Sequence, residues 1–238
     1  MTNYLHPFTS SKNRILAALP SDEYNMIAPK PEHVHLSYGR VLYDFSEEIR
    51  HVYFLNSGMG SLLSVTEDGA IVEVGMVGNE GMLGMPIIMG METMPYRVTM
   101  QVAGTALRVR AGLVKQAFDQ HRVLHKLLLR YTYTLIAQIT QSALCNHFHS
   151  VEERLCRWLL TTRDRTKLDK FRLTHEMLSH MLGARRQSVT EVANMLRKAG
   201  LIDYVRGEIT LLDTQGLRDR ACECYEVVKE AHVQAQVA

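Results

Sequence analysis

The sequence predicts an α+β protein built from a β-roll, a long helix and a winged helix-turn-helix domain, in that order. Three observations carry this prediction: short β-rich runs before residue 110, an unbroken helical segment near residues 121–148, and a two-helix pattern at residues 173–196 that precedes a hairpin pattern. We therefore expect a β-roll at residues 1–120, a dimerisation helix at residues 121–149 and a DNA-binding domain at residues 150–238.

Seven short runs of alternating or β-rich residues predict the strands of the roll. Turn-forming residues such as Glu67-Asp68-Gly69 separate them at short intervals, and a helical lead-in precedes them. The predicted strands are residues 33–36, 41–45, 52–55, 61–66, 70–77, 97–102 and 105–110, and the lead-in helices are residues 12–19 and 22–27.

Composition places the chain among globular proteins of a reducing compartment. Its 238 residues are 46% hydrophobic, which is enough for a sizeable core. No apolar run approaches the roughly 20 residues that span a bilayer, and the first residues lack the apolar centre of a signal peptide. The four cysteines are unevenly spaced, unlike a disulfide framework. We expect a cytoplasmic protein without a membrane partner.

Charge is unevenly divided along the chain. Residues 1–120 hold 9 basic and 12 acidic residues, whereas residues 121–238 hold 18 basic and 13 acidic ones. A solvated linker also carries charges, but this asymmetry favours a nucleic-acid-binding face on the C-terminal part. Five basic residues stand immediately before the two-helix pattern: Arg163, Arg165, Lys167, Lys170 and Arg172.

Residues 173–196 have the spacing of two short helices that cross at a tight turn. Thr174 is a predicted N-cap, and Gly183 can adopt the positive φ that a sharp turn after a helix requires. The inward positions of the motif hold small or apolar residues, namely Leu178, Leu182, Ala184, Val189 and Val192.

The second helix, at about residues 185–198, carries side chains suited to reading bases in a major groove. The alternative interpretation is a helical packing unit that does not contact nucleic acid. Cations at a helix start oppose the helix dipole, and this cost is easier to explain if phosphates or bases bind them. A hairpin pattern follows at residues 201–211 and turns at Arg206-Gly207. The candidate DNA-binding residues are Thr174, Arg185, Arg186, Gln187, Ser188, Thr190, Glu191 and, at the tip of the wing, Arg206.

The long helix shows coiled-coil spacing, with steps of four and three residues. Packing on its own domain is the alternative, and further apolar residues such as Ile136 and Ile139 suit a helix that contacts both its own roll and a partner. Ser150 and Glu153 predict a capping box for a helix at residues 151–162. The predicted dimer seam is Leu124, Leu128, Tyr131, Leu135, Gln138 and Ser142, followed by Cys145.

These parts, in this order, resemble the Crp–Fnr superfamily of bacterial transcription regulators. The most specific stretches are VEERLCRWLL at residues 151–160, LTHEMLSHMLGARRQSVTEVANMLRKAGLI at residues 173–202, and GNEGMLG at residues 78–84. The last of these resembles the entry to the family's cyclic-nucleotide cassette. The resemblance implies a cyclic-nucleotide-binding-like jelly roll and a homodimer on a near-palindromic operator, with RNA polymerase as a candidate further partner.

Of the polar ligand-binding residues that the family pattern has in this cassette, the sequence retains one. Arg97 matches the phosphate-binding arginine, but Met82 replaces the ribose-binding glutamate and Val98 replaces a serine. We therefore expect no binding of cyclic AMP in the usual manner. The glycine turn can present N–H groups to an anion, although glycines more often serve structure. The candidate effector residues are Gly81, Met82, Leu83, Gly84, Arg97 and Val98, and the methionines around them suit plain core or an apolar effector, of which we favour core.

Other sensor chemistries find little support in the sequence. The iron–sulfur members carry an N-terminal cysteine cluster, whereas the first cysteine here is Cys145, so no iron–sulfur cluster is expected. His33, His35 and His51 are candidate haem ligands, but such a pattern on strands is typical of a solvated face, and we expect no haem. Cys222 with Cys224, and His147 with His149, lack the spacing of a closed zinc site, and we assign no metal.

The leading hypothesis is a sequence-specific, dimeric transcription regulator whose main partner is double-stranded DNA. In the recognition helix, Arg186 matches the family's first base-reading arginine, whereas Gln187 replaces an acidic reader and Glu191 an arginine, which implies a distinct operator. The alternative is a sensory module whose main activity is to bind a small, cyclic-nucleotide-like effector through Arg97. No catalytic motif with supporting context occurs, so we do not expect an enzyme.

Overall fold

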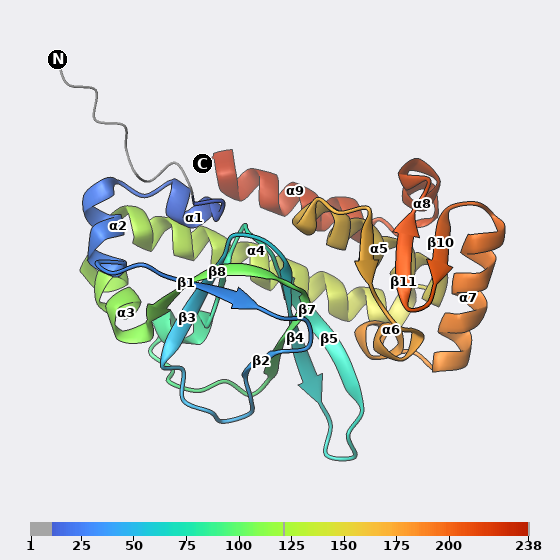
Figure 1. The fold of residues 1–238 in the computed structure, drawn as a ribbon, viewed down its shortest axis with the longest axis horizontal. Helices are drawn as coiled ribbons and strands as arrows, with labels where there is room; N and C mark the ends of the chain where they lie inside the picture. The colour runs from blue at the N-terminus through green and yellow to red at the C-terminus, as the bar shows by residue number, and fades with distance from the viewer. Residues whose placement is uncertain (1–10, 121, 238) are drawn as a thin grey trace. The chain divides into compact units, whose positions relative to one another are not determined.

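A computed structural model describes residues 11–120 and 122–237 (Figure 1). It divides into two compact units, one of residues 1–60 and 77–132 and one of residues 61–76 and 133–238. The predicted three-part division at residues 120 and 149 differs from these units, and residue 121 and the N-terminal stretch considered for a signal peptide lie outside the described residues. None of the helices in the described residues is long and apolar enough to cross a membrane.

The first unit is rich in antiparallel strands. One sheet has the strand order β1-β8-β3-β6, with Leu36 opposite Gly104 and Phe54 opposite Leu107 and Met82. In addition, β2 pairs with β7 across an irregular register between Val41 and Tyr43. The elements are α1 (Arg14–Ala17), α2 (Ser21–Ile27), β1 (Glu32–Leu36), β2 (Val41–Tyr43), β3 (His51–Leu55), β6 (Met82–Leu83), the 3-10 helix η1 (Met85–Met89), β7 (Arg97–Val102), β8 (Gly104–Arg110) and α3 (Ala111–Gln120).

The predicted strands and the two lead-in helices are confirmed, with ends shifted by one or two residues. The core of this unit contains Leu36, Phe54, Leu55 and Leu107, all fully buried. Five of the seven methionines between residues 76 and 100 are also buried, which fits the interpretation of plain core. Met89 and Met91 are exposed.

The second unit contains most of the β4–β5 pair and the C-terminal elements. A three-stranded sheet of order β10-β11-β9 lies beside the helix pair α6 and α7 (Figure 1). The elements are β4 (Met59–Val65), β5 (Ile71–Val77), α4 (Arg122–Phe148), which starts in the first unit, α5 (Val151–Thr166), β9 (Lys170–Arg172), α6 (His175–Leu182), α7 (Arg186–Lys198), β10 (Ile202–Val205), β11 (Glu208–Leu211), α8 (Thr214–Arg220) and α9 (Cys224–Val237).

Helix α5 forms the centre of this unit. Its start is the predicted capping box: the Glu153 N–H donates to the Ser150 hydroxyl, and the Ser150 backbone N–H donates to the Glu153 carboxylate. Trp158 is buried, and its indole N–H donates to Glu73 of β5 over 2.8 Å. Helices α6 and α7 pack through the buried side chains of Leu178, Val189 and Leu196, among others.

Candidate DNA-binding surface and ligand cassette

The two-helix motif has the predicted caps. The Thr174 hydroxyl accepts a hydrogen bond from the Met177 N–H over 3.2 Å, which makes Thr174 the N-cap of α6. Gly183 ends α6 with a φ of 56°. Leu178, Leu182 and Val189 are buried as predicted, whereas Val192 and Ala184 are half-buried. The local sequence therefore fixes the crossing of α6 and α7.

The first turn of α7 presents cations to solvent. Arg185 occupies the N-cap position without a side-chain capping bond, and Arg185, Arg186 and Gln187 are exposed. Within the described residues, neither arginine side chain makes an ion pair or a hydrogen bond. Because the positive end of the helix dipole opposes these charges, an anionic partner would relieve a cost of about 0.3–1 kcal/mol.

The neighbouring polar residues of α7 are already paired. Gln187 donates to the Glu191 carboxylate over 3.0 Å, so the two side chains form one polar unit on the exposed face. The Thr190 hydroxyl donates to the Arg186 carbonyl over 2.9 Å, and Nδ1 of His175 lies 3.0 Å from the same hydroxyl. Thr190 is therefore directed towards α6 rather than free for a base.

His175 is a residue whose role the sequence analysis missed. Its ring stacks on Tyr204 of β10, with centroids 4.5 Å apart and planes at 24°. Burial, and secondarily the charge of Arg186, lower the pKa of His175, so the imidazole is neutral at pH 7. This neutral ring joins α6, α7 and β10. A lone histidine at the first position of a helix carries no sequence signal for such a role.

The hairpin predicted at residues 201–211 is present as β10 and β11. Arg206 and Gly207 have φ values of 51° and 79°, which are the values of a two-residue type I′ turn. Arg206 is exposed at the tip, and its side chain has no ion pair or hydrogen bond in the part of the chain that the structure describes. The wing thus offers a third unpaired cation.

The five basic residues before α6 contribute less to this surface than their sequence position suggests. Arg163 pairs with Asp169, and Lys170 pairs with Glu208 of β11. Arg165 is buried and donates to Gln138 of α4. Three of the five predicted cations therefore serve the fold of the second unit.

The glycine turn of the cassette is packed against its own unit. A Cβ at Gly81 would lie 2.1 Å from the Tyr131 ring, and one at Gly84, whose φ is 99°, would lie 2.7 Å from the Tyr43 hydroxyl. The Gly78 N–H donates to the Glu80 carboxylate over 3.0 Å. Met82 and Leu83, which form β6, are fully buried. These contacts favour the structural interpretation of the turn.

Arg97 is held by an acidic side chain. Its Nε and one terminal nitrogen each donate to Asp44 over 3.0 Å, and its guanidinium lies over the Phe45 ring, 5.5 Å from the ring centroid. The hydrogen bond from Arg97 lowers the pKa of the Asp44 carboxyl, so the pair is ionised at neutral pH. Val98 is buried opposite Tyr43. A phosphate would have to displace Asp44 to bind this edge of the Arg97 guanidinium.

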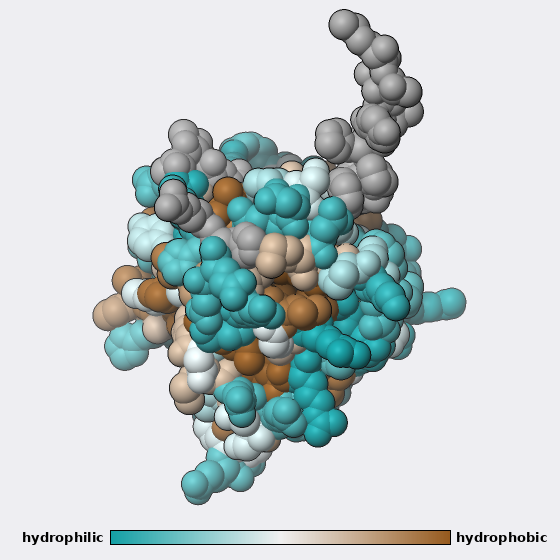
Figure 2. Space-filling model, turned by 90° about the vertical axis from the view of Figure 1, so that its left-hand side faces the viewer, coloured by the Kyte–Doolittle hydropathy of each residue, from teal (hydrophilic) through white to brown (hydrophobic). Residues whose placement is uncertain are grey.

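Two surface cavities of the first unit lie elsewhere. One, of about 590 Å³, is lined by Ile27, Glu32, His51 and Arg108, among others; the second, of about 560 Å³, shares His51 and is also lined by Ile87. None of the six candidate effector residues lines either cavity. Figure 2 looks onto the side of the molecule that carries α2 and α3, where hydrophobic residues lie among hydrophilic ones. His33 and His35 are exposed, as expected of a solvated strand face.

Helix α4 requires a correction of the predicted seam. Leu124, Leu128, Tyr131, Leu135, Gln138 and Ser142 are all buried within the chain. For example, Gln138 donates to the Met76 carbonyl over 3.1 Å. The seam therefore faces the chain's own fold, as in the alternative interpretation, and a different stripe of α4 is exposed. That stripe consists of Leu129, Tyr133, Ile136, Leu144 and Phe148.

Comparison with known proteins agrees with these features. The cyclic nucleotide-binding domain family matches residues 33–121, and the Crp-like helix-turn-helix domain family matches residues 153–220. No curated protein sequence matches the chain.

Three solved structures illustrate the similarity in fold. FixK2 from Bradyrhizobium japonicum has a TM-score of 0.69 at 14% identity, covering 81% of this chain and 98% of its own. A CRP-family transcriptional regulator from Thermus thermophilus has a TM-score of 0.67 at 22% identity, covering 79% and 96%. The c-di-GMP-responsive regulator CLP from Xanthomonas campestris has a TM-score of 0.66 at 15% identity, covering 82% and 100%. With a cyclic nucleotide-binding-like domain followed by a Crp-like helix-turn-helix domain, the chain belongs to the Crp–Fnr family of transcription regulators.

Proposed function

We propose that the protein acts as a homodimer that binds a near-palindromic operator through the first turns of α7. The observation that carries this proposal is a group of three exposed cations on α7 and the wing whose side chains are unpaired in the described part of the chain: Arg185, Arg186 and Arg206. The helix-turn-helix geometry directs the start of the second helix into a major groove and leaves the wing beside a phosphate backbone.

Base selection is assigned to Arg186 and to the pair of Gln187 with Glu191. Arg186 is suited to a bidentate contact with guanine. The bond from Gln187 occupies one acceptor site of the Glu191 carboxylate. The carboxylate has further acceptor sites, which are available for a cytosine amino group. Thr174 and Ser188, both half-buried, are placed for backbone contacts, whereas Thr190 acts as a support.

Substitution of Arg186 by alanine tests this assignment. Gel shifts on a randomised duplex library should show a loss of roughly 1–3 kcal/mol in binding free energy, or about 5- to 150-fold in Kd, and relaxed selection at one base position. Lys198→Ala, at the other end of α7, is the matched control and should leave selection unchanged. If the Arg186→Ala protein keeps wild-type affinity and base preference, Arg186 does not read the operator.

The exposed stripe of α4 is the proposed dimer interface, with a second copy of the chain as its occupant. Ile136 and Phe148 are 57% and 73% exposed, which is unusual for such residues at positions that repeat along one helix face. A two-fold axis along this face would bury the same stripe on both copies. A dimer also matches the two half-sites of a palindromic operator.

Sedimentation of an Ile136→Glu variant tests the interface. The introduced charge should convert the dimer to a monomer at micromolar concentration. Val233→Glu, at a residue of α9 that is 54% exposed, is the matched control and should sediment like the wild type. A monomeric wild type, or a dimeric Ile136→Glu variant with native circular dichroism, would contradict the assignment.

The sensor-like domain is proposed not to bind cyclic AMP in the usual manner. Two observations support this: Arg97 is engaged by Asp44, and the cassette positions Met82 and Val98 are buried apolar side chains. The alternative, a sensory module that acts through Arg97, requires that an effector either displaces Asp44 from the Nε edge of Arg97 or binds the remaining terminal nitrogen. A transcription regulator works where the chromosome is, so we place the protein in the cytoplasm.

A further inference from the structure

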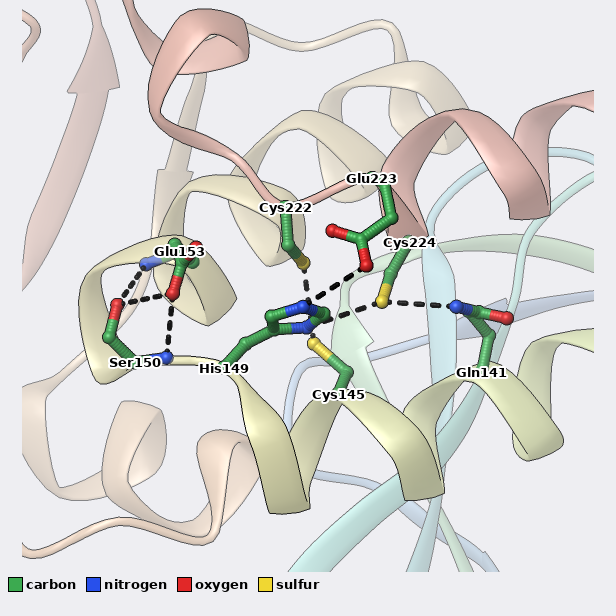
Figure 3. Close-up of polar contacts among 8 residues, drawn as sticks. All are labelled: Gln141, Cys145, His149, Ser150, Glu153, Cys222, Glu223 and Cys224. Atoms are coloured by element: carbon green, nitrogen blue, oxygen red, sulfur yellow. Dashed lines mark hydrogen bonds and ion pairs between the residues drawn. The ribbon is translucent and has the colours of Figure 1, made fainter.

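Three cysteines and one histidine meet in the second unit, outside the DNA-binding surface and the ligand cassette. Cys145 lies in the last turn of α4, His149 directly follows that helix, and Cys222 and Cys224 lie at the start of α9 (Figure 3). The three cysteines are buried, and the His149 side chain is only 13% exposed. Their potential ligand atoms all lie within 4.8 Å of one another.

Local structure explains why the four side chains converge. The His149 N–H donates to the Cys145 carbonyl over 3.2 Å, which continues the helical turn and sets both side chains on one face of α4. Ser150 then begins α5 by its capping box, so the chain turns directly after His149. Cys224 is the first residue of α9 and Cys222 lies two residues before it, and both thiols face α4 in Figure 3.

The distances are close to those of a tetrahedral zinc site. With Zn–S bonds of about 2.3 Å and Zn–N bonds of about 2.0–2.1 Å, neighbouring ligand atoms of such a site lie about 3.6–3.8 Å apart. Here Sγ of Cys145 is 3.5 Å from Sγ of Cys222, and Sγ of Cys224 is 3.4 Å from Nδ1 of His149. All four cysteines of the chain are free thiols in the structure.

The groups around the cluster are those that orient metal ligands. Nδ1 of His149 faces the thiols, while its Nε2 lies 3.3 Å from a carboxylate oxygen of Glu223 (Figure 3). A carboxylate behind the histidine fixes the ring tautomer in many zinc sites. The Gln141 amide donates to Sγ of Cys224 over 3.2 Å, a bond that stabilises a thiolate.

We propose that Cys145, His149, Cys222 and Cys224 bind one Zn²⁺ ion in a closed structural site. Three thiolates and one imidazole complete a tetrahedral shell, which is the donor set that zinc prefers and which leaves no position for a substrate. The sequence analysis assigned no metal because it considered Cys222 with Cys224, and His147 with His149, as separate pairs. The fold instead brings Cys222 and Cys224 together with Cys145 and His149. His147 is exposed beside Phe148 and takes no part.

A metal ion here would tie the end of α4 to the start of α9, two segments that lie far apart in the sequence. Between them the chain forms α5 to α8, which include the helix-turn-helix motif. Because a closed metal site couples binding to folding, the ion would stabilise the second unit as a whole.

Metal analysis of the purified full-length protein tests the site. Elemental analysis and native mass spectrometry should find about one zinc ion per chain in the wild type and in Cys156→Ser, the matched control, since Cys156 is a buried cysteine outside the cluster. Cys224→Ser and His149→Gln should retain less than about one tenth of that zinc.

Two further measurements keep the test decisive if a ligand variant fails to fold. Wild-type protein stripped of metal and loaded with Co²⁺ should show thiolate-to-cobalt charge-transfer bands and the intense visible bands of tetrahedral cobalt. Glu223→Gln, at an exposed side chain directly before α9, should weaken zinc affinity about 10-fold or more, while Glu230→Gln, at an exposed residue within α9, should not. Folded, reduced wild-type protein without zinc and without these cobalt bands overturns the proposal, as does a Cys145–Cys222 disulfide in the protein as isolated.

Discussion

Arg186 at the start of α7 and Arg97 at the start of β7 are both matched to family arginines that bind a partner, yet their surroundings differ. Arg186 is exposed and, within the described residues, its side chain has no hydrogen bond or ion pair. Arg97 is half-buried and donates two hydrogen bonds to Asp44. The arginine proposed to contact DNA is open, whereas the arginine of the cassette is engaged by the protein itself.

The two regions therefore differ in whether their polar groups have partners within the protein. At the DNA surface the fold leaves charge uncompensated at a helix start, where it is unfavourable for the isolated protein. In the cassette, each polar or glycine position already has an internal partner: Asp44 for Arg97, Glu80 for the Gly78 N–H and Tyr131 against Gly81. Substitutions in both regions test how far this contrast extends.

The second unit also contains one buried acid, Glu73 of β5, which gives the largest expected effect. Burial raises the pKa of Glu73 to about 7, and hydrogen bonds from Ser61 and Trp158 only partly oppose this shift. The folded protein therefore holds a proton that the unfolded chain releases above pH 4.5. Between pH 4.5 and about 7 the free energy of unfolding should fall, by about 3 kcal/mol in total.

Glu73→Gln should remove this pH dependence, since a neutral amide can still accept from Trp158 and donate to Ser61. Urea unfolding at pH 5 and pH 8 measures it, and the variant should be the more stable protein at pH 8. Glu67→Gln, in the exposed turn between β4 and β5, is the matched control and should follow the wild type. An unchanged pH slope in Glu73→Gln would show that Glu73 is ionised in the folded protein.

Gly81→Ala tests whether the cassette turn is packed or open. The added Cβ would lie 2.1 Å from the Tyr131 ring, so the free energy of unfolding should fall by about 2–3 kcal/mol. Gly112→Ala in α3 is the control: its Cβ meets nothing within 4 Å, and a gain of up to about 1 kcal/mol is expected. Thermal unfolding compares the two, and a Gly81→Ala protein as stable as the wild type would mean that the turn has room for a ligand.

The strands and the helix-turn-helix could be predicted from the sequence because their signals are local. Turn residues such as Glu67-Asp68-Gly69 separate neighbouring strands, and Thr174 and Gly183 mark the ends of α6 by their own conformational preferences. The two-residue strand β6 had no such signal, because it exists only through its pairing with β3. Helices α3, α8 and α9 were also left unassigned by the sequence analysis.

The faces of α4 and the cysteine cluster depended on the tertiary fold. A repeat of four and three residues identifies an apolar stripe but does not say whether the chain or a partner covers it. Gln138 and Ser142, polar members of the predicted seam, are buried by contacts of the second unit. Cys145 and His149 are one helical turn apart, but Cys222 and Cys224 reach them only after α5 to α8 have packed.

Arg206→Asn should affect the fold and DNA binding in opposite directions. Arg206 has a φ of 51°, a strained value for an arginine, whereas Asn-Gly is the preferred pair of a type I′ turn. The variant should therefore gain about 0.5–1 kcal/mol of stability and lose one phosphate contact. Operator affinity measured against salt concentration should show a slope reduced by about 1.

Lys167→Asn separates the two effects of that substitution. Lys167 also has a positive φ, 59°, but it ends α5 away from the wing. Its replacement should raise stability similarly and leave the salt slope as in the wild type. If both variants lower the slope equally, the loss reflects net charge and not a phosphate contact of the wing.

Asp44→Asn gives the smallest expected effect and bears most directly on the two arginines. The Arg97–Asp44 pair is about 35–44% exposed, so its loss should cost less than about 1 kcal/mol of stability. The variant frees the Arg97 guanidinium and makes this arginine as open as Arg186. Because Met82 and Val98 remain apolar and buried, calorimetry should still detect no micromolar binding of cyclic AMP. Micromolar binding that a second substitution, Arg97→Ala, abolishes would show instead that the internal carboxylate alone closes the site.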